Sequence, residues 1–333
     1  MTPMTTWIPD RSRGKALQGV APLVFRWQVE ARFNGVALDT YLAEQLGVSK
    51  NYAEDLIDFG SVQIEGRAER NGQRILTGME KVVVYPPRMG IRRHYEISPE
   101  RIIYQDRYLL LYDKEAGIPS QATPADAYNN LFAALRRYLE KKSPHSYIAL
   151  HHRLDKEASG LMIFALDRSI NRNLSRAFQN RKVIKDYLIL ARGHPTHQLW
   201  VVAEDIGREK GRYTVCVQGR GKPAETAFHA LYQEANHCWL WARPRSGRTH
   251  QIRLHLARSG HPILGDRLYG GPPAPNLYLH AYRLIVRHPQ HGGEMIFLAP
   301  VPSTWPEPPG QLHDLPRVMG DAPEKPTDLT QTV

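Results

Sequence analysis

Apolar residues recur at two different spacings along the chain, and the first spacing indicates a small helical module. Between residues 37 and 60 they return every three or four positions, which predicts two short helices. Ser49 can cap the second helix, and Gly60 can end it. Strand-like segments follow at 61–66 and 81–87, so we expect two helices and a small sheet in this part of the chain.

From about residue 100 onward, strand patterns dominate. Segments such as YLLLYD, LMIFAL, IKDYLILARG and CWLWARP alternate or are continuously apolar, and turn residues separate them. Two longer segments, 127–142 and 169–182, have helical periodicity. Strands and helices do not alternate as in a parallel βαβ fold. We therefore expect an α+β fold whose main domain contains a mixed, largely antiparallel sheet.

The two ends of the chain differ from this interior in composition. Residues 1–25 are polar with scattered Pro and Gly, and residues 303–333 are rich in Pro and charge. Such segments are typical of a disordered arm and a tail. Between them we expect a small module at 26–90 and the main domain at 95–302.

Composition favours a polyanionic partner in a reducing compartment. The net charge is +11 over 333 residues, which favours nucleic acid or an acidic membrane as the partner. Cys216 and Cys238 form no CxxC motif, so we expect a cytoplasmic protein without disulfides. No apolar run approaches the roughly 18 residues of a membrane span, and the first residues do not resemble a secretory signal. There is no HExxH motif, and we expect no metal site.

The positive charge is concentrated in two segments. Residues 171–192 contain six Lys or Arg and one acid, and residues 243–258 contain five Arg and no acid. If strand ends bring these segments to one face, they would form a groove for nucleic acid, although scattered basic residues are often only solvated surface. Residues 37–70 contain seven acids and three bases, a net charge of −4, which does not favour phosphate binding.

The segment HHRLDKEASG, residues 151–160, raises the first question of chemistry. It places Asp155 between Arg153 and Lys156, just before a Ser-Gly pair and an apolar run. Asp, Ser and Gly favour turns, so a turn before a strand is one interpretation. The other is a nucleophilic carboxylate on a loop that faces a basic groove. These ten residues alone favour the turn.

Four segments together resemble the RluA-type pseudouridine synthases over about residues 100–300. They are HHRLDKEASG, IKDYLILARGHP, RPRSGRTHQIRLHLARSGHPILGDRLYG and YLHAYRLIVRHP, in this order. The resemblance implies the pseudouridine synthase fold and an RNA-modifying isomerase that needs no cofactor. The segment from LDTYLAEQL to VSKNYAEDLIDFGSVQIEG resembles the alpha-L RNA-binding module, with Glu54, Asp55 and Asp58 at positions that are usually basic. Glu115 after Lys114 and Ala158 before Ser-Gly also depart from the family pattern.

The resemblance implies roles for three catalytic residues. Asp155 matches the acid that acts during cleavage of the bond between ribose carbon 1 and uracil nitrogen 1. It could attack carbon 1, attack the uracil ring or remove the proton of ribose carbon 2. Arg253 matches the guanidinium that pairs with this acid, and its planar fork can hold a carboxylate through two hydrogen bonds. Tyr187 matches the aromatic residue that stacks on the extruded uracil and can assist a late proton transfer.

The resemblance and the charge distribution also suggest contacts with RNA. The target base must be flipped out of its stack, and Arg153 matches a position that can fill the gap. The other candidates for RNA contact are Lys185, Arg248, His250, Gln251, Arg172 and Arg181.

We therefore expect an RNA pseudouridine synthase that acts as a monomer on structured RNA. The expected substrate is ribosomal RNA, with transfer RNA as the alternative. A second possibility is a non-catalytic RNA-binding protein on the same fold. A third is an RNA glycosidase or nuclease, which would need a second carboxylate or metal ligands near Asp155.

Overall fold

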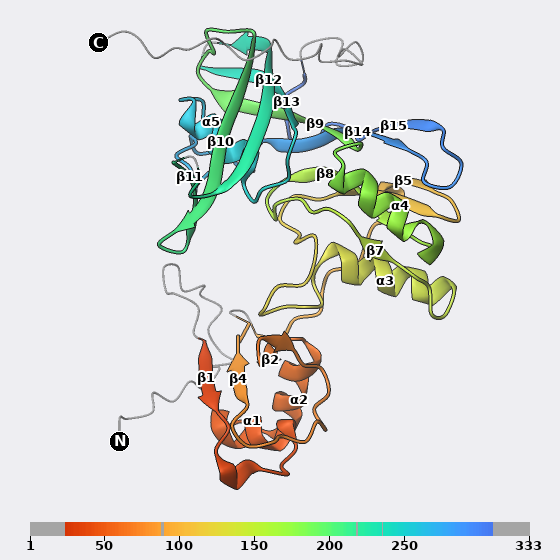
Figure 1. Ribbon diagram of the computed structural model, residues 1–333, viewed down its shortest axis with the longest axis vertical. Coiled ribbons are helices and arrows are strands. Elements are labelled where there is room, and N and C mark those ends of the chain that lie inside the picture. Colours follow the sequence, from red (N-terminus) through yellow and green to blue (C-terminus); the bar gives the residue numbers. More distant parts are fainter. Residues whose placement is uncertain (1–23, 88–89, 218, 235, 309–333) are drawn as a thin grey trace. The chain divides into compact units, whose positions relative to one another are not determined.

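The computed structural model describes residues 24–87, 90–217, 219–234 and 236–308 (Figure 1). Contacts between residues divide the chain into two units, Met1–Ile97 with Gln121–Lys142, and Ser98–Ser120 with Ser143–Val333. Nearly all of the expected arm at 1–25 and most of the expected tail at 303–333 lie outside the described residues. Within the described part, no helix has the length and apolarity that crossing a membrane requires.

The first unit contains a four-stranded antiparallel sheet with the strand order β1-β4-β2-β3. Its elements are β1 (Phe25–Gln28), η1 (Ala31–Phe33), α1 (Leu38–Leu46), α2 (Lys50–Asp58), β2 (Val62–Ile64), β3 (Arg67–Ala68), β4 (Lys81–Val84) and α3 (Leu131–Lys142). The two helices predicted between residues 37 and 60 are confirmed. Ser49 Oγ accepts from the Tyr52 amide (3.2 Å) and caps α2, and Gly47 ends α1 at φ 64°.

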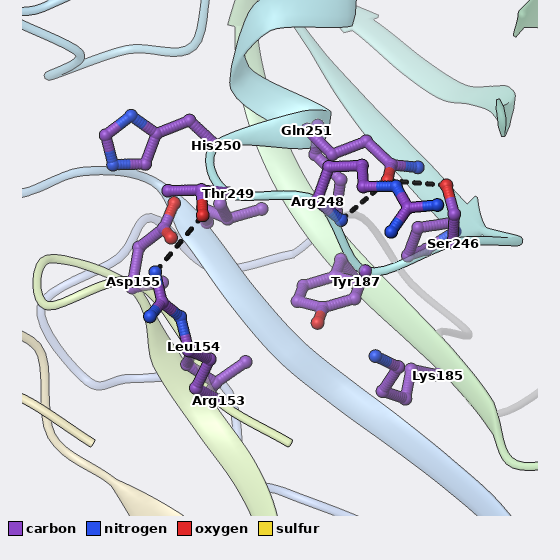
Figure 2. A pocket seen from close by; sticks show the side chains of 15 residues that line it. Arg153, Leu154, Asp155, Lys185, Tyr187, Ser246, Arg248, Thr249, His250 and Gln251 are labelled. Atoms are coloured by element: carbon purple, nitrogen blue, oxygen red, sulfur yellow. Dashed lines mark hydrogen bonds between the residues drawn. The ribbon is translucent and has the colours of Figure 1, made fainter. Parts of the chain in front are cut away.

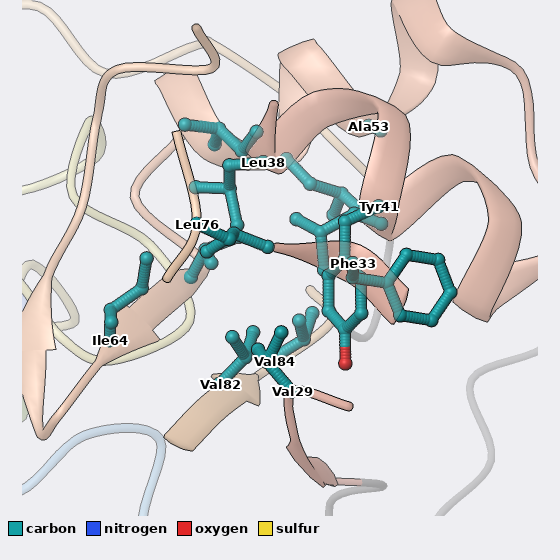
Figure 3. Packing of buried hydrophobic residues seen from close by; sticks show 13 residues of the cluster. Val29, Phe33, Leu38, Tyr41, Ala53, Ile64, Leu76, Val82 and Val84 are labelled. Atoms are coloured by element: carbon teal, nitrogen blue, oxygen red, sulfur yellow. The ribbon is translucent and has the colours of Figure 1, made fainter. Parts of the chain in front are cut away.

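The apolar residues of α1 and α2 form the core of the first unit (Figure 3). Leu38 and Leu42 are completely buried, and the rings of Phe33 and Tyr41 meet edge to face with centroids 4.9 Å apart. Each such Leu stabilises the fold by about 2 kcal/mol through burial of apolar surface. The helical spacing of these residues therefore reflects a real core.

A later segment of the chain returns to the first unit. The Ala127 amide donates to the Phe59 carbonyl (2.9 Å), and Ser61 Oγ donates to the Ala125 carbonyl (2.9 Å). Gly60 allows this approach, because a Cβ atom there would lie 2.4 Å from Ala127 Cβ. The segment 121–142, with α3, thus packs with the first unit, although its place in the sequence lies within the expected main domain.

The second unit is built on an eleven-stranded, mostly antiparallel sheet, which confirms the predicted fold class. Its main strand order is β11-β10-β12-β13-β9-β14-β8-β6-β5, with β15 paired to β14 and β7 to β8. The strands are β5 (Ile102–Gln105), β6 (Leu109–Lys114), β7 (Ala149–Leu150), β8 (Ser159–Ala165), β9 (Ile184–Arg192), β10 (Leu199–Glu209), β11 (Arg212–Cys216), β12 (Lys222–Glu234), β13 (His237–Pro244), β14 (Leu279–Arg287) and β15 (Glu294–Leu298). The short helix η2 (Pro99–Arg101) precedes β5.

Two helices complete the second unit. On α4 (Arg168–Gln179), Ile170 and Leu174 are buried in a core with residues of β6, β8 and β14. The helix α5 (Gln251–Arg258) packs near β10, β11, β12 and β13, and Leu254 contacts Ile206 and Ala224 in a small apolar cluster. Neither α5 nor β10 was expected from the spacing of apolar residues. The loop that leads into α5 carries several of the candidate site residues.

Candidate active site

Asp155 lies in a loop whose backbone is fixed on both sides of it. The Ser120 hydroxyl donates to the Leu154 carbonyl (2.7 Å) and accepts from the Leu154 amide (3.0 Å). The Lys156 carbonyl accepts from the Lys114 ammonium (3.2 Å). Because the residues before and after Asp155 are both held, the backbone that carries its side chain has a defined position.

Gly160 explains why the motif ends in Ser-Gly. It has φ 109°, and a Cβ atom there would lie 2.4 Å from the Ala281 carbonyl oxygen on β14. Ser159 Oγ lies 2.8 Å from His280 Nδ1, also on β14. Only glycine combines this dihedral with such a close approach of two strands. The turn residues thus anchor the loop to the sheet, and they leave Asp155 available for chemistry.

One pocket in the second unit is lined by most of the predicted site residues (Figure 2). Those that line it are Arg153, Asp155, Lys185, Tyr187, Arg248, His250 and Gln251. They come from the Asp155 loop, from β9 and from the loop that enters α5. Arg253, Arg172 and Arg181 are not among the lining residues.

Tyr187 and Lys185 project from the same face of β9 (Figure 2). The Tyr187 side chain is only 6% exposed, and its burial, together with the charges of Asp155 and Asp186, raises its pKa. The hydroxyl is therefore held in its neutral form, which can donate a hydrogen bond. Burial also lowers the pKa of Lys185 to about 8, so this ammonium is easily deprotonated.

Arg253 differs from our expectation in its bidentate partner. Its Nε and Nη2 donate to the two oxygens of Asp266 (2.8 and 2.7 Å), and both side chains are almost completely buried. Arg253 Nη1 lies 3.6 Å from Asp155 Oδ2 and 3.8 Å from Glu157 Oε2. Burial lowers the pKa of Arg253, but Asp266 and Asp155 outweigh this and raise it overall. Arg253 thus reaches Asp155 through one nitrogen, and the expected two-bond pair with Asp155 is wrong.

Asp266 and Lys114 are two functional residues that sequence reasoning missed. Asp266 lies in the quoted GHPILGDRLYG segment, but nothing in the sequence indicates that it pairs with Arg253. Lys114 is completely buried, and its ammonium donates to the carbonyls of Glu115 and Ile118 (2.8 Å each) as well as to that of Lys156. Burial lowers the pKa of Lys114 to about 7. The sequence marks Lys114 only through Glu115, which departs from the family pattern at the next position.

The loop before α5 is held by Gln251. Its amide nitrogen donates to the Glu225 carbonyl (2.9 Å) and Thr226 Oγ1 (3.0 Å). Its amide oxygen accepts from Ser246 Oγ (2.7 Å) and the Arg248 amide (3.0 Å). These four bonds use the full capacity of the side chain, which is 4% exposed. Gln251 therefore shapes the pocket wall, and a direct bond to RNA, as we expected, would require it to break one of these contacts.

The remaining candidates for RNA contact have different environments. Arg153 is exposed and donates to Thr249 Oγ1 (3.2 Å), at the edge of the pocket. Arg248 Nε donates to the Pro223 carbonyl (3.1 Å). Arg172 on α4 and Arg181 just after it are exposed outside the pocket. Only part of the predicted set can therefore touch a base inside the pocket, and the rest can reach only RNA that extends beyond it.

The pocket combines a carboxylate, a neutral phenol and nearby cations. Asp155 is the only acidic side chain among the described residues that line it. Hydrolysis of glycosidic bonds usually needs a pair of carboxylates on either side of the bond. A single carboxylate beside an aromatic ring instead suits chemistry at the ribose of a base that is retained in the site. This difference weighs against a glycosidase.

Comparisons with known proteins agree with this geometry. A family model described as RNA pseudouridylate synthase matches residues 108–258. The chain is 32% identical over 290 residues to an uncharacterized RNA pseudouridine synthase of Aquifex aeolicus, covering 80% of this chain and 91% of that protein. It is 34% identical over 209 residues to the dual-specificity RNA pseudouridine synthase RluA of Escherichia coli K12, covering 60% of this chain and 92% of that protein.

Solved structures support the fold. Human RNA pseudouridylate synthase domain containing 4 has a TM-score of 0.52 at 22% identity, covering 61% of this chain and 89% of that one. The sequence matches, the sheet and the pocket all lead to one assignment. The chain belongs to the RluA-type family of RNA pseudouridine synthases, isomerases that convert uridine in RNA to pseudouridine.

Proposed function

We propose that Asp155 is the catalytic carboxylate, that Tyr187 stacks on the target uracil and that Arg253 orients Asp155 from behind the pocket. The observation that carries this proposal is that Asp155 and Tyr187 line one pocket while a buried Arg253 nitrogen lies 3.6 Å from Asp155. The buried guanidinium gives the Asp155 carboxylate a fixed opposite charge on the side away from the substrate.

The reaction needs no added reagent. The bond between ribose carbon 1 and uracil nitrogen 1 breaks, and a bond between ribose carbon 1 and uracil carbon 5 forms. Nitrogen 1 gains a proton and carbon 5 loses one, so atoms and electrons balance. Tyr187, a neutral phenol beside the base, can take part in these proton transfers, and its ring can hold the detached uracil while it turns.

The proposed substrate is ribosomal RNA, with transfer RNA as the alternative. Flipping a base out of structured RNA costs a few kcal/mol. Arg153, exposed at the pocket edge, can occupy the vacated place in the stack. The Escherichia coli relative is a dual-specificity RNA pseudouridine synthase, which supports testing both classes of RNA. We propose a monomer as the active species.

Release of tritium from uracil carbon 5 tests this function directly. We expect the wild-type protein to release label from ribosomal or transfer RNA, and Asp155→Asn to lower the rate by about 10⁴-fold or more, as for other nucleophilic residues. Glu157→Gln is the matched control, because Glu157 lies at a similar distance from Arg253 but is half exposed and does not line the pocket. It should keep activity within about threefold, as surface charges do. Release by Asp155→Asn at the wild-type rate would remove the assigned role.

A further inference from the structure

The turn that contains Asp266 and Tyr269 lies outside the pocket but contacts His250, which lines it, and Arg253, which lies 3.6 Å from Asp155. It is tightly packed, since a Cβ atom on Gly265 would lie 1.8 Å from the Asn276 carbonyl oxygen. Asp266 Oδ1 accepts from the amide of Tyr269 (3.3 Å) as well as from Arg253. One carboxylate therefore fixes both the turn and the guanidinium.

Tyr269 connects this turn to His250. Its hydroxyl donates to the Tyr213 carbonyl (3.3 Å) and lies 2.7 Å from His250 Nδ1. A hydroxyl has one proton, so if that proton goes to Tyr213, His250 must donate its Nδ1–H to Tyr269. The same tyrosine ring lies 5.3 Å from the guanidinium carbon of Arg253. Tyr269 thus contacts both His250, which lines the pocket, and Arg253, which lies 3.6 Å from Asp155.

His250 needs such support because of its backbone. It has φ 57° and ψ 21°, a left-handed conformation that costs a residue other than glycine about 1–3 kcal/mol. No side-chain hydrogen bond caps α5 at this position, although the His250 carbonyl accepts from the Leu254 amide (2.9 Å) as the helix begins. The conformation of His250 therefore sets where α5 starts, and α5 carries Arg253.

We propose that Tyr269 is a positioning residue for the isomerisation: its hydroxyl fixes the tautomer and orientation of the His250 ring, and its ring supports Arg253. Tyr269 does not line the pocket and does not touch the substrate. It acts through the start of α5, whose loop forms one wall of the pocket. This inference rests on the proposed function, because it assigns Asp155 and Arg253 to the reaction.

Tyr269→Phe and Tyr213→Phe form a matched pair of variants of the full chain. The first removes the hydroxyl that bonds to His250 and keeps the ring beside Arg253. The second removes a hydroxyl without a hydrogen-bond partner among the described residues and keeps the carbonyl that accepts from Tyr269. Loss of one hydrogen bond corresponds to about a tenfold change. We expect Tyr269→Phe to lower kcat about tenfold with KM unchanged, and Tyr213→Phe to change neither.

Nitrogen-15 spectra of labelled histidine report the tautomer of His250. A loss of stability alone would not change this tautomer. We expect His250 to carry its proton on Nδ1 in the wild type and in Tyr213→Phe, and partly on Nε2 in Tyr269→Phe. A tautomer or a kcat that is the same in Tyr269→Phe as in the wild type would overturn the proposal. If the wild type releases no tritium from any RNA, the proposed function fails, and the tautomer alone then decides whether Tyr269 sets His250.

Discussion

Two segments of the second unit contain similar positive charge but use it differently. In residues 243–258, four of the five arginines form ion pairs with carboxylates of the same unit. The pairs are Arg243–Asp186 (2.7 Å), Arg245–Glu225 (2.9 Å), Arg253–Asp266 (2.7 Å) and Arg258–Glu204 (3.5 Å). Most of the charge in this segment therefore stabilises the protein or its site.

Residues 171–192 are the opposite case. Among the described residues, none of the six cations in this segment lies within 4.0 Å of a carboxylate. Arg172 and Arg176 are both exposed and four positions apart on α4, where like charges cost a few tenths of a kcal/mol. Unpaired, exposed cations are the ones that can neutralise phosphates. Two segments with similar numbers of Lys and Arg, six and five, thus differ in role: the cations of one stabilise the protein, and those of the other are free to bind phosphate.

Among the ion pairs of residues 243–258, we expect loss of the Asp266 carboxylate to destabilise the protein most. In Asp266→Asn, the buried guanidinium of Arg253 loses its closest opposite charge. Leaving a buried charge uncompensated costs about 3–5 kcal/mol, so we expect the free energy of unfolding to fall by about 3 kcal/mol in urea denaturation. The control is Glu225→Gln, whose ion pair with Arg245 is exposed and is worth at most about 1 kcal/mol. Equal losses in the two variants would contradict the distinction between the pairs.

Arg253→Lys tests whether shape matters as well as charge. A lysine keeps the positive charge but cannot bond to both oxygens of Asp266 and still face Asp155. We expect the rate of tritium release to fall about 50-fold, with a smaller loss of stability than in Asp266→Asn. Activity within twofold of the wild type would show that charge alone suffices at this position.

The sequence predicts some of this arrangement for clear reasons. The helix α1 has one buried face, so its apolar residues recur at helical spacing, and the strands of the second unit have turn residues between them. The helix α5 has no such signal, because Ile252, Leu254 and Leu256 are buried at alternate positions while Arg253 and His255 are buried between them. A helix buried on all sides has no polar face to produce a period of 3.6.

The partners of the site residues were also beyond prediction. Asp155, Tyr187 and Arg253 could be named from motifs, because a motif preserves residue type and order. Arg253 pairs with Asp266 because a turn brings Asp266 beside α5. Backbone contacts such as the close approach at Gly265 fix that turn, and a motif does not show them. The sequence also does not show that Lys114 supports the Asp155 loop. Lys114 donates to backbone carbonyls, and because every residue has one, no residue type marks the partner.

Lys185 sharpens the comparison, because it belongs to the unpaired segment but is half-buried in the pocket. Burial lowers its pKa to about 8, so the ammonium is charged below this pH and becomes neutral above it. If it contacts phosphate, affinity for RNA should fall about fivefold as the pH rises from 7 to 9, since one ionic contact is lost. Lys185→Arg stays charged and should lose this dependence, whereas Lys182→Arg, at an exposed site, should retain it. The same pH dependence in Lys185→Arg as in the wild type would exclude Lys185 as its origin.

The smallest effect is expected from single cations of the unpaired segment. Arg172→Ala and Arg181→Ala should each weaken RNA binding about threefold and reduce the slope of log affinity against log salt by about 0.7–0.9, the value for one phosphate contact. Arg258→Ala is the matched control, because its guanidinium lies 3.5 Å from Glu204 in the paired segment. Its removal should leave the slope unchanged. Filter binding or fluorescence anisotropy between low and moderate salt measures these slopes for each variant. If Arg258→Ala lowers the slope as much as Arg172→Ala does, pairing within the protein does not withdraw a cation from RNA, and the contrast between the two segments fails.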